Sequence, residues 1–252
     1  MRQSSRHRRK TPLPRRWAPL AVLLGSISGA GCGGAPTPPA ESAPPPPEGD
    51  RPLATMPSTS AEVGAMDPEK TTAAFDRAGS KLSACFAKGA ERIPYMGGDV
   101  EFYVRVSSDG SARYAYVKDS TLGDRETESC MLDALRAVSW PKPVGGEQGI
   151  AKRQIHFDPG GDERPPVAWS AGQLGAPWKK ARPAVSECLK KAGTGPIKAT
   201  LYVDTDGKPQ AVGASVSDEK GEAALACVVE VLRSTTFPSP GSYASKVSVE
   251  IR

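Results

Sequence analysis

The sequence predicts an α+β fold made of two tandem αββαβ modules, each a three-stranded antiparallel sheet covered by two helices. The first supporting observation is an internal repeat, because Cys130 follows Gly110 by 20 residues and Cys227 follows Gly207 by the same 20. The second is that each copy has an alternating apolar segment leading to Asp-Gly, a pattern typical of a strand entering a hairpin. The third is that apolar residues recur at helical spacing before and after each hairpin.

The first module is predicted to span residues 67–158. Asp67 supplies a side-chain cap for a helix, and Pro68 suits the first helical position. Asp109-Gly110 supplies a hairpin turn, and Asp124 can cap a second helix. The predicted elements in order are a helix through 75–86, a strand over 100–106, its hairpin partner over 112–117, a helix that ends before 140–143, and a strand over 154–157.

The second module is predicted to span residues 176–252, after a connector rich in turn-forming residues at 159–175. The first copy carries six more residues than the second, around 91–98, and such an insertion is expected in a loop. Pro183 is expected in the first turn of its helix, where the missing N–H would be unpaired in any case. The predicted elements are a helix over 178–191, strands over 197–203 and 210–216, a helix over 222–233, and a strand over 247–251.

Four of the five cysteines are predicted to form one disulfide within each module. Cys85 and Cys130 lie on the apolar faces of two helices that cover the same face of a sheet, and Cys188 and Cys227 repeat this arrangement. Disulfides of this kind are chemically permitted in an exported protein. The fifth cysteine, Cys32, lies in a different context near the N-terminus.

Residues 1–31 are expected to be a signal peptide, because a basic start is followed by an apolar run and then by small residues. Ala30-Gly31-Cys32 resembles the lipobox of bacterial lipoproteins, which implies that Cys32 carries lipid after cleavage. Gly33 stands where an aspartate would retain such a protein at the inner membrane, so the resemblance implies the outer membrane, facing the periplasm. Simple secretion after cleavage at Ala30 is the alternative.

Residues 32–66 are expected to form a proline-rich disordered linker. They contain almost no large apolar residue and therefore cannot bury enough surface to fold. The proline runs favour extended polyproline II, so the segment is expected to hold the modules away from the membrane as a spacer. Recruitment of a partner by the proline-rich runs is the alternative interpretation.

The charge distribution argues against a nucleic-acid partner. The net charge is +5, but seven of the 33 basic residues precede residue 17, where no acidic residue occurs. The remaining 26 basic residues face 28 acidic ones. Phosphate binding needs lysine and arginine clustered on the folded part of a protein, and this pattern does not provide such clusters.

The sequence favours a non-enzymatic protein without a cofactor or a metal site. General acid–base catalysis needs a base near the reacting group, and the two histidines are His7, in the predicted signal peptide, and His156, for which a structural or exposed role is expected. The cysteines of the modules lack the CxxC spacing of zinc knuckles and redox sites. No glycine-rich phosphate-binding loop follows a predicted strand.

The order of these motifs resembles that of the TonB C-terminal-like domain, and more closely the AgmX/PglI C-terminal version known from gliding bacteria. The shared pattern is cysteine, alternating strand, Asp-Gly, returning strand, second cysteine, and then an aromatic-Pro-x-Pro segment before the last strand. It covers about residues 68–158 and 176–252. The resemblance implies a cell-envelope protein that binds other proteins or builds a complex, for instance one for motility or transport.

Binding is expected to occur by addition of a partner strand at an exposed sheet edge, which a three-stranded unit leaves available. Tyr103, Tyr116 and Tyr202 are expected to be exposed, and either supply selectivity or simply cover the sheet. The alternative is a structural envelope protein that fixes membrane spacing or grips peptidoglycan without a peptide partner.

Overall fold

The computed structural model describes residues 61–251, which lie within one compact unit. The predicted signal peptide, Cys32 and most of the predicted linker lie outside the described residues. The α+β class and the tandem organisation are confirmed, because the described residues form two four-stranded sheets, each with its own pair of α-helices. No helix within residues 61–251 is long and apolar enough to cross a membrane.

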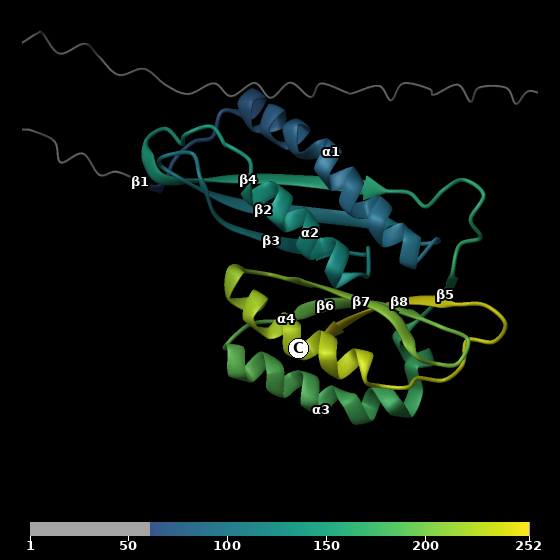
Figure 1. Cartoon of the computed structure of the whole chain (residues 1–252). Helices are drawn as coiled ribbons and strands as arrows, with labels where there is room; N and C mark the ends of the chain where they lie inside the picture. The colour runs from purple at the N-terminus through teal and green to yellow at the C-terminus, as the bar shows by residue number, and fades with distance from the viewer. Residues whose placement is uncertain (1–60, 252) are drawn as a thin grey trace, which may run out of the picture. The chain divides into compact units, whose positions relative to one another are not determined.

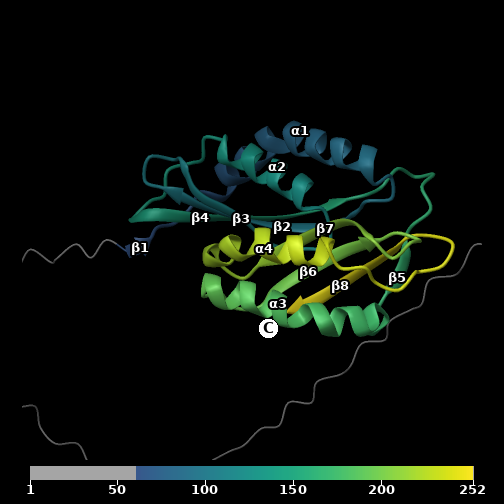
Figure 2. The same ribbon diagram turned by 60° about the horizontal axis from the view of Figure 1, so that its bottom comes forward.

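The first module is a mixed sheet with the strand order β1-β4-β2-β3. β1 runs parallel to β4, while the β4-β2 and β2-β3 pairs are antiparallel. Helices α1 and α2 lie over one face of this sheet (Figures 1 and 2). The elements are β1 (Ala61–Val63), α1 (Pro68–Arg92), β2 (Gly98–Ser107), β3 (Ala112–Ser120), α2 (Arg125–Arg136) and β4 (Gly146–Phe157).

The second module repeats this topology with the strand order β5-β8-β6-β7. β5 is parallel to β8, and the other pairs are antiparallel. Helices α3 and α4 run beside each other (Figure 1). The elements are β5 (Val167–Trp169), η1 (Ala171–Leu174), α3 (Gly175–Ala192), β6 (Ile197–Val203), β7 (Pro209–Val216), η2 (Glu219–Gly221), α4 (Glu222–Arg233) and β8 (Ser245–Ile251).

The capping and turn residues predicted from the sequence occupy their expected places. The Asp67 side chain accepts a hydrogen bond from the Lys70 N–H, and Asp124 accepts one from the Thr127 N–H. Gly110 and Gly207 adopt φ of 89° and 84°, a region that L side chains rarely enter. The two caps fix where α1 and α2 begin, and the two glycines fix where each hairpin reverses.

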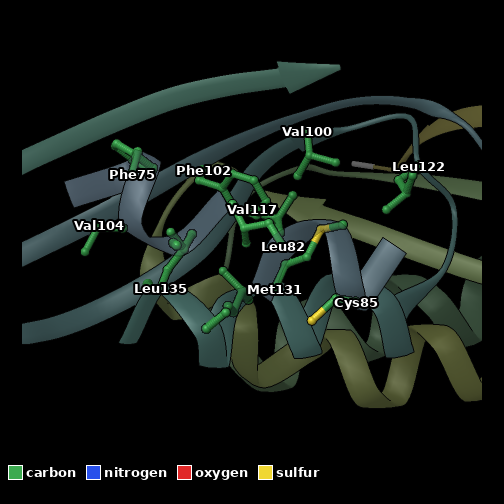
Figure 3. Close-up of a cluster of buried hydrophobic side chains, with 14 of the residues drawn as sticks. Phe75, Leu82, Cys85, Val100, Phe102, Val104, Val117, Leu122, Met131 and Leu135 are labelled. Atoms are coloured by element: carbon green, nitrogen blue, oxygen red, sulfur yellow. The ribbon is translucent and has the colours of Figure 1, made fainter. Parts of the chain in front are cut away.

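Each core fills the space between the helix pair and one sheet face. In the first module, Phe75 and Leu82 of α1 and Met131 and Leu135 of α2 meet Phe102 and its neighbours on the sheet (Figure 3). The expected disulfides are present, Cys85 with Cys130 between α1 and α2, and Cys188 with Cys227 between α3 and α4. Each module is therefore cross-linked within itself.

The expected number of strands was wrong, because each sheet has four strands and not three. The additional strands are β1, which lies within the predicted linker, and β5, which lies within the predicted connector. Both are three residues long and add in parallel to the outer edge of the last strand of their module. The third strand of the first module is also longer than predicted, since β4 begins at Gly146.

The expectation for Pro183 was also wrong. Pro183 lies inside α3, well beyond its first turn, and the helix continues through it. Its ring is on the exposed side of α3. Water can therefore satisfy the carbonyl that the missing N–H leaves unpaired, which lowers the cost of an interior proline.

The modules share their hydrophobic cores. Tyr202 and Ala211 of the second module belong to the core cluster of the first, while Tyr103 and Tyr116 of the first module belong to that of the second. The extra residues of the first repeat take part, because Tyr95 donates a hydrogen bond to the Gln210 side chain and packs against the Tyr202 ring. The predicted loop insertion is thus a contact segment.

Ion pairs also join the two modules. Lys198 lies 2.6 Å from Asp119, Arg125 lies 2.6 Å from Glu222, and the Arg105 guanidinium lies 3.8 Å from Glu219. They come from strands β2, β3 and β6, from the short helix η2 that precedes α4, and from the first residues of α2 and α4. The two modules are consequently joined by a mixed apolar and ionic interface.

Candidate functional site

One sheet edge of the first module is only partly covered. The edge formed by β3 faces β7 across the module interface. Nearby, Thr200 of β6 donates to the Ser120 carbonyl of β3, and Glu128 of α2 accepts from the Ala214 N–H of β7. On the opposite side of the first sheet, β1 pairs with β4 only from Gly146 to Gln148. Within the described part of the chain, no strand pairs with the outer edge of β4 beyond that point.

The unpaired backbone groups of this edge can be assigned from the ladder. The Gly64 N–H donates to the Gln148 carbonyl at 2.7 Å, so the backbone groups of Gln148 point outward to β1. Backbone direction alternates along a strand, and the β2-β4 ladder shows no register shift. The residues whose N–H and C=O face outward beyond Gln148 are Ile150, Lys152, Gln154 and His156.

A groove of about 440 Å³ runs between this edge and helix α1. Its apolar side is formed by Phe75 and Leu82 of α1 together with Ile155 and Phe157 of β4. Phe86 stacks on Phe157 with ring centroids 5.1 Å apart and extends the apolar surface. The volume falls within the range of about 300–1,000 Å³ that is usual for ligand sites.

A charged pair stands at the rim of the groove. Arg153 contacts Asp76 at 2.6 Å, and its guanidinium lies 5.7 Å from the centre of the Phe75 ring. Both partners are partly exposed, so this pair contributes little to stability. The pair holds the Arg153 side chain against α1, whereas Lys152 and Gln154 on either side of it are exposed.

His156 lies at the far end of the same edge. Its Nδ1 is 3.0 Å from Asp99 and its Nε2 is 2.9 Å from Asp158. Hydrogen bonds to Asp158 and then to Asp99 raise the pKa of the imidazole above its ordinary value. With both ring nitrogens bonded to carboxylates, His156 ties the start of β2 to the residue after β4. The geometry places it in a structural role at an exposed position.

The expectation that three tyrosines are exposed was wrong. Tyr103, Tyr116 and Tyr202 have exposed fractions of 9%, 5% and 0%, because the module interface covers them. The rings of Tyr103 and Tyr116 stack with centroids 4.8 Å apart. Burial raises the pKa of Tyr116 and of Tyr202 to about 12. These side chains join the modules and are not available to a partner.

A second groove, of about 710 Å³, lies between α3 and α4 in the second module. It is lined by small and polar residues, including Ala181, Ala184 and Thr235. Its walls are helices, whose backbone groups are already paired within each helix. The groove beside β4 therefore offers more for recognition, since it combines apolar side chains with unpaired backbone.

Sequence reasoning missed one buried ionisable group at the module interface. Glu128 of α2 is fully buried, and its carboxylate accepts hydrogen bonds from the Ser120 hydroxyl at 2.7 Å and from the Ala214 N–H at 3.2 Å. Burial raises the pKa of this carboxyl to about 7. A glutamate on the otherwise apolar side of a predicted helix was the signal that could have identified it.

The elevated pKa predicts a pH dependence of stability. Between about pH 4.5, the unfolded value, and about pH 7, the folded chain holds a proton that the unfolded chain releases, so the Glu128 contribution is lost as pH rises through this window. Glu128→Gln removes this titration, and we expect the variant to be more stable than the parent above about pH 7, by on the order of 3 kcal/mol at most. Urea unfolding at a series of pH values measures this difference. If the free energy of unfolding changed with pH in the same way in both chains, the prediction would be wrong.

The described residues contain no group of three or more histidine, cysteine, aspartate or glutamate side chains placed to hold a metal ion. Comparison with known proteins returned no matching family model, no matching curated protein and no matching solved structure.

Proposed function

We propose that the chain is a non-catalytic adaptor that binds an extended segment of another protein by strand addition along the outer edge of β4. The observation that carries the proposal is that, among residues 61–251, no strand pairs with the outer edge of β4 beyond Gln148, and an apolar groove lies beside this edge. β1 supports the proposal, because this short strand already adds to the same edge in parallel. Its last residue, Val63, pairs with Gln148 of β4. A partner segment would continue the sheet from there.

At this edge, the backbone groups and the groove would bind different parts of a partner segment. Outward N–H and C=O groups bind the backbone of any extended segment, while alternate side chains of that segment enter the groove or lie beside Lys152 and Gln154. The first module is the preferred site. β4 is 12 residues long with its first three beside β1, whereas β8 is 7 residues long with three paired to β5.

We further propose that the adaptor works in the cell envelope, tethered by lipid on Cys32 at the outer membrane and spaced from it by the linker. The signal-like start and the lipobox-like sequence support this placement. The two disulfides fit an oxidising compartment. Lipid labelling and membrane partitioning that persist in a Cys32→Ser chain would rule out the tether.

Strand addition predicts that Gln154→Pro abolishes partner binding. The Gln154 N–H points outward, so proline removes a donor for the partner without removing a β2-β4 hydrogen bond, and proline is tolerated on such edges. A photocrosslinking residue in place of Lys152 in intact cells should yield a protein adduct that is lost in the Gln154→Pro chain. Gln154→Ala, which keeps the N–H, should retain the adduct.

Two outcomes count against the adaptor. An adduct of equal yield in the Gln154→Pro chain would show that the edge backbone is not used. Retention of the chain on purified cell wall, with no protein adduct at Lys152, would favour the structural role instead. A crosslinker in place of Ser80, which is exposed on α1 outside the groove lining, serves as the positional control.

A further inference from the structure

Helix α1 contains two glycines in its interior, and only one of them is explained by packing within the chain. A Cβ on Gly89 would lie 2.1 Å from the Thr127 hydroxyl oxygen, so α2 leaves room only for glycine there. A Cβ on Gly79 would meet no atom of the described residues within 4 Å. Gly79 also lacks a left-handed φ, so neither crowding nor backbone conformation requires glycine at this position.

Glycine in a helix interior is unfavourable. It costs roughly 0.5–1 kcal/mol relative to alanine, because glycine loses more backbone freedom on folding. Gly79 lines the groove beside β4, with Phe75 one turn before it and Ser83 one turn after it. What Gly79 provides is open space in the wall of the groove, opposite Arg153 and Ile155 of β4.

We infer that Gly79 forms a pocket for one large apolar side chain of the segment that adds to β4. This inference rests on the proposed strand addition and specifies which partners the edge accepts. Side chains of an added strand alternate between the two sheet faces, so those on the helix side enter the groove. The half-buried Ile155 and the outer edges of the buried Phe75 and Leu82 side chains line the same groove as Gly79. The partner is therefore an extended peptide segment with a bulky aliphatic or aromatic residue at the matching position.

The occupant follows from continuity with β1. β1 shows that this edge accepts an added parallel strand, and its last backbone hydrogen bond to the edge joins the Gly64 N–H to the Gln148 carbonyl. Beyond Gln148, no strand among the described residues pairs with this edge, although Met66 packs against Gly149. The groove lies farther along, beside residues 153–157 of β4. A segment lying there meets outward backbone on one side and the Gly79 pocket on the other, so one extended peptide satisfies both features.

The test uses random peptides displayed on phage and selected on the full chain. Peptides retained by the parent chain, but not by the Gln154→Pro chain, should share a large apolar residue at one position. For a synthetic peptide of this set, Gly79→Leu should weaken binding at least about tenfold in fluorescence anisotropy. Ser80→Leu, a neighbouring change outside the groove lining, should leave the affinity unchanged.

A double-mutant cycle then locates the side chain. Replacing the shared apolar residue of the peptide by alanine should cost at least about tenfold against the parent chain and much less against the Gly79→Leu chain, because both changes remove the same contact. Gly79→Ala provides a folding control, since it should raise the urea midpoint of unfolding.

The possible outcomes distinguish a failure of the Gly79 pocket from a failure of the proposed strand addition. Peptides that need the Gln154 N–H but bind Gly79→Leu as tightly as the parent would overturn the pocket and leave strand addition standing. Selected peptides without a shared apolar residue would do the same. A library that yields no peptide dependent on Gln154 would overturn both.

Discussion

Replacement of both Cys85 and Cys130 by alanine is expected to lower the free energy of unfolding by about 4 kcal/mol. The disulfide closes a loop with a sequence separation of 45 residues, and the chain-entropy model assigns about 4 kcal/mol to a loop of that length. A typical folded domain is stable by only about 5–15 kcal/mol, so the loss is a large fraction of the total. Urea unfolding of the parent and the variant, both without reductant, measures it.

The second module supplies the matched comparison. Cys188 and Cys227 are separated by 39 residues, so the same double replacement there should cost nearly the same. A loss below about 1 kcal/mol in both variants would show that the unfolded chain is already restricted by other means. A large loss in only one would show that the modules unfold separately, despite their shared interface.

Tyr202→Ala is expected to cost about 3–5 kcal/mol, the range for large aromatic residues in cores. Tyr202 is fully buried between the modules, its hydroxyl accepts from the Gly97 N–H at 3.2 Å, and the Lys246 ammonium lies 5.3 Å from its ring centre. The substitution leaves a cavity at the interface and leaves the Gly97 amide without its partner. We expect unfolding to separate into two transitions, visible in calorimetry.

Tyr114→Ala is the control for this prediction. Tyr114 is also on a strand of the same unit, but it is 41% exposed, and its removal should change stability by less than about 0.5 kcal/mol. Equal effects of the two substitutions would show that the burial of Tyr202 does not hold the modules together.

The elements that were predicted correctly depend on residues close together in the sequence. Asp67 and Asp124 cap helices through contacts three residues away, and Gly110 and Gly207 turn hairpins through their own φ. The disulfide pairing was also accessible, because helical spacing placed each cysteine on the core face of its helix. The repeat then extended each local inference to the other module.

The elements that the sequence did not reveal depend on contacts between distant segments. β1 and β5 are three residues long, which is too short for alternation to be recognised, and they exist because β4 and β8 offer an edge. The module interface was not predicted either, because it also depends on contacts between distant segments. Its residues include Arg105, Asp119 and Lys198, which are typical of a solvated sheet face.

The sequence predicted the type of candidate site but not its location. An exposed strand edge was expected, but which edge stays free depends on β1, β5 and the packing of the modules. The groove likewise forms from two elements far apart in sequence, with Gly79 on α1 and Ile155 on β4. A glycine in an apolar helical pattern was the available signal, and its meaning emerged only once its surroundings were known.

Arg125 and Glu222 occupy equivalent positions in the two repeats, since both lie five residues before the second cysteine of their copy, yet they contact each other at 2.6 Å. In a pair of identical molecules related by two-fold symmetry, a position on the axis meets its own twin, and two arginines or two glutamates there would repel. Fusion of both copies into one polypeptide removes this restriction, because each half can acquire its own charge. The pair thus favours contact between two unlike halves over contact between two identical ones.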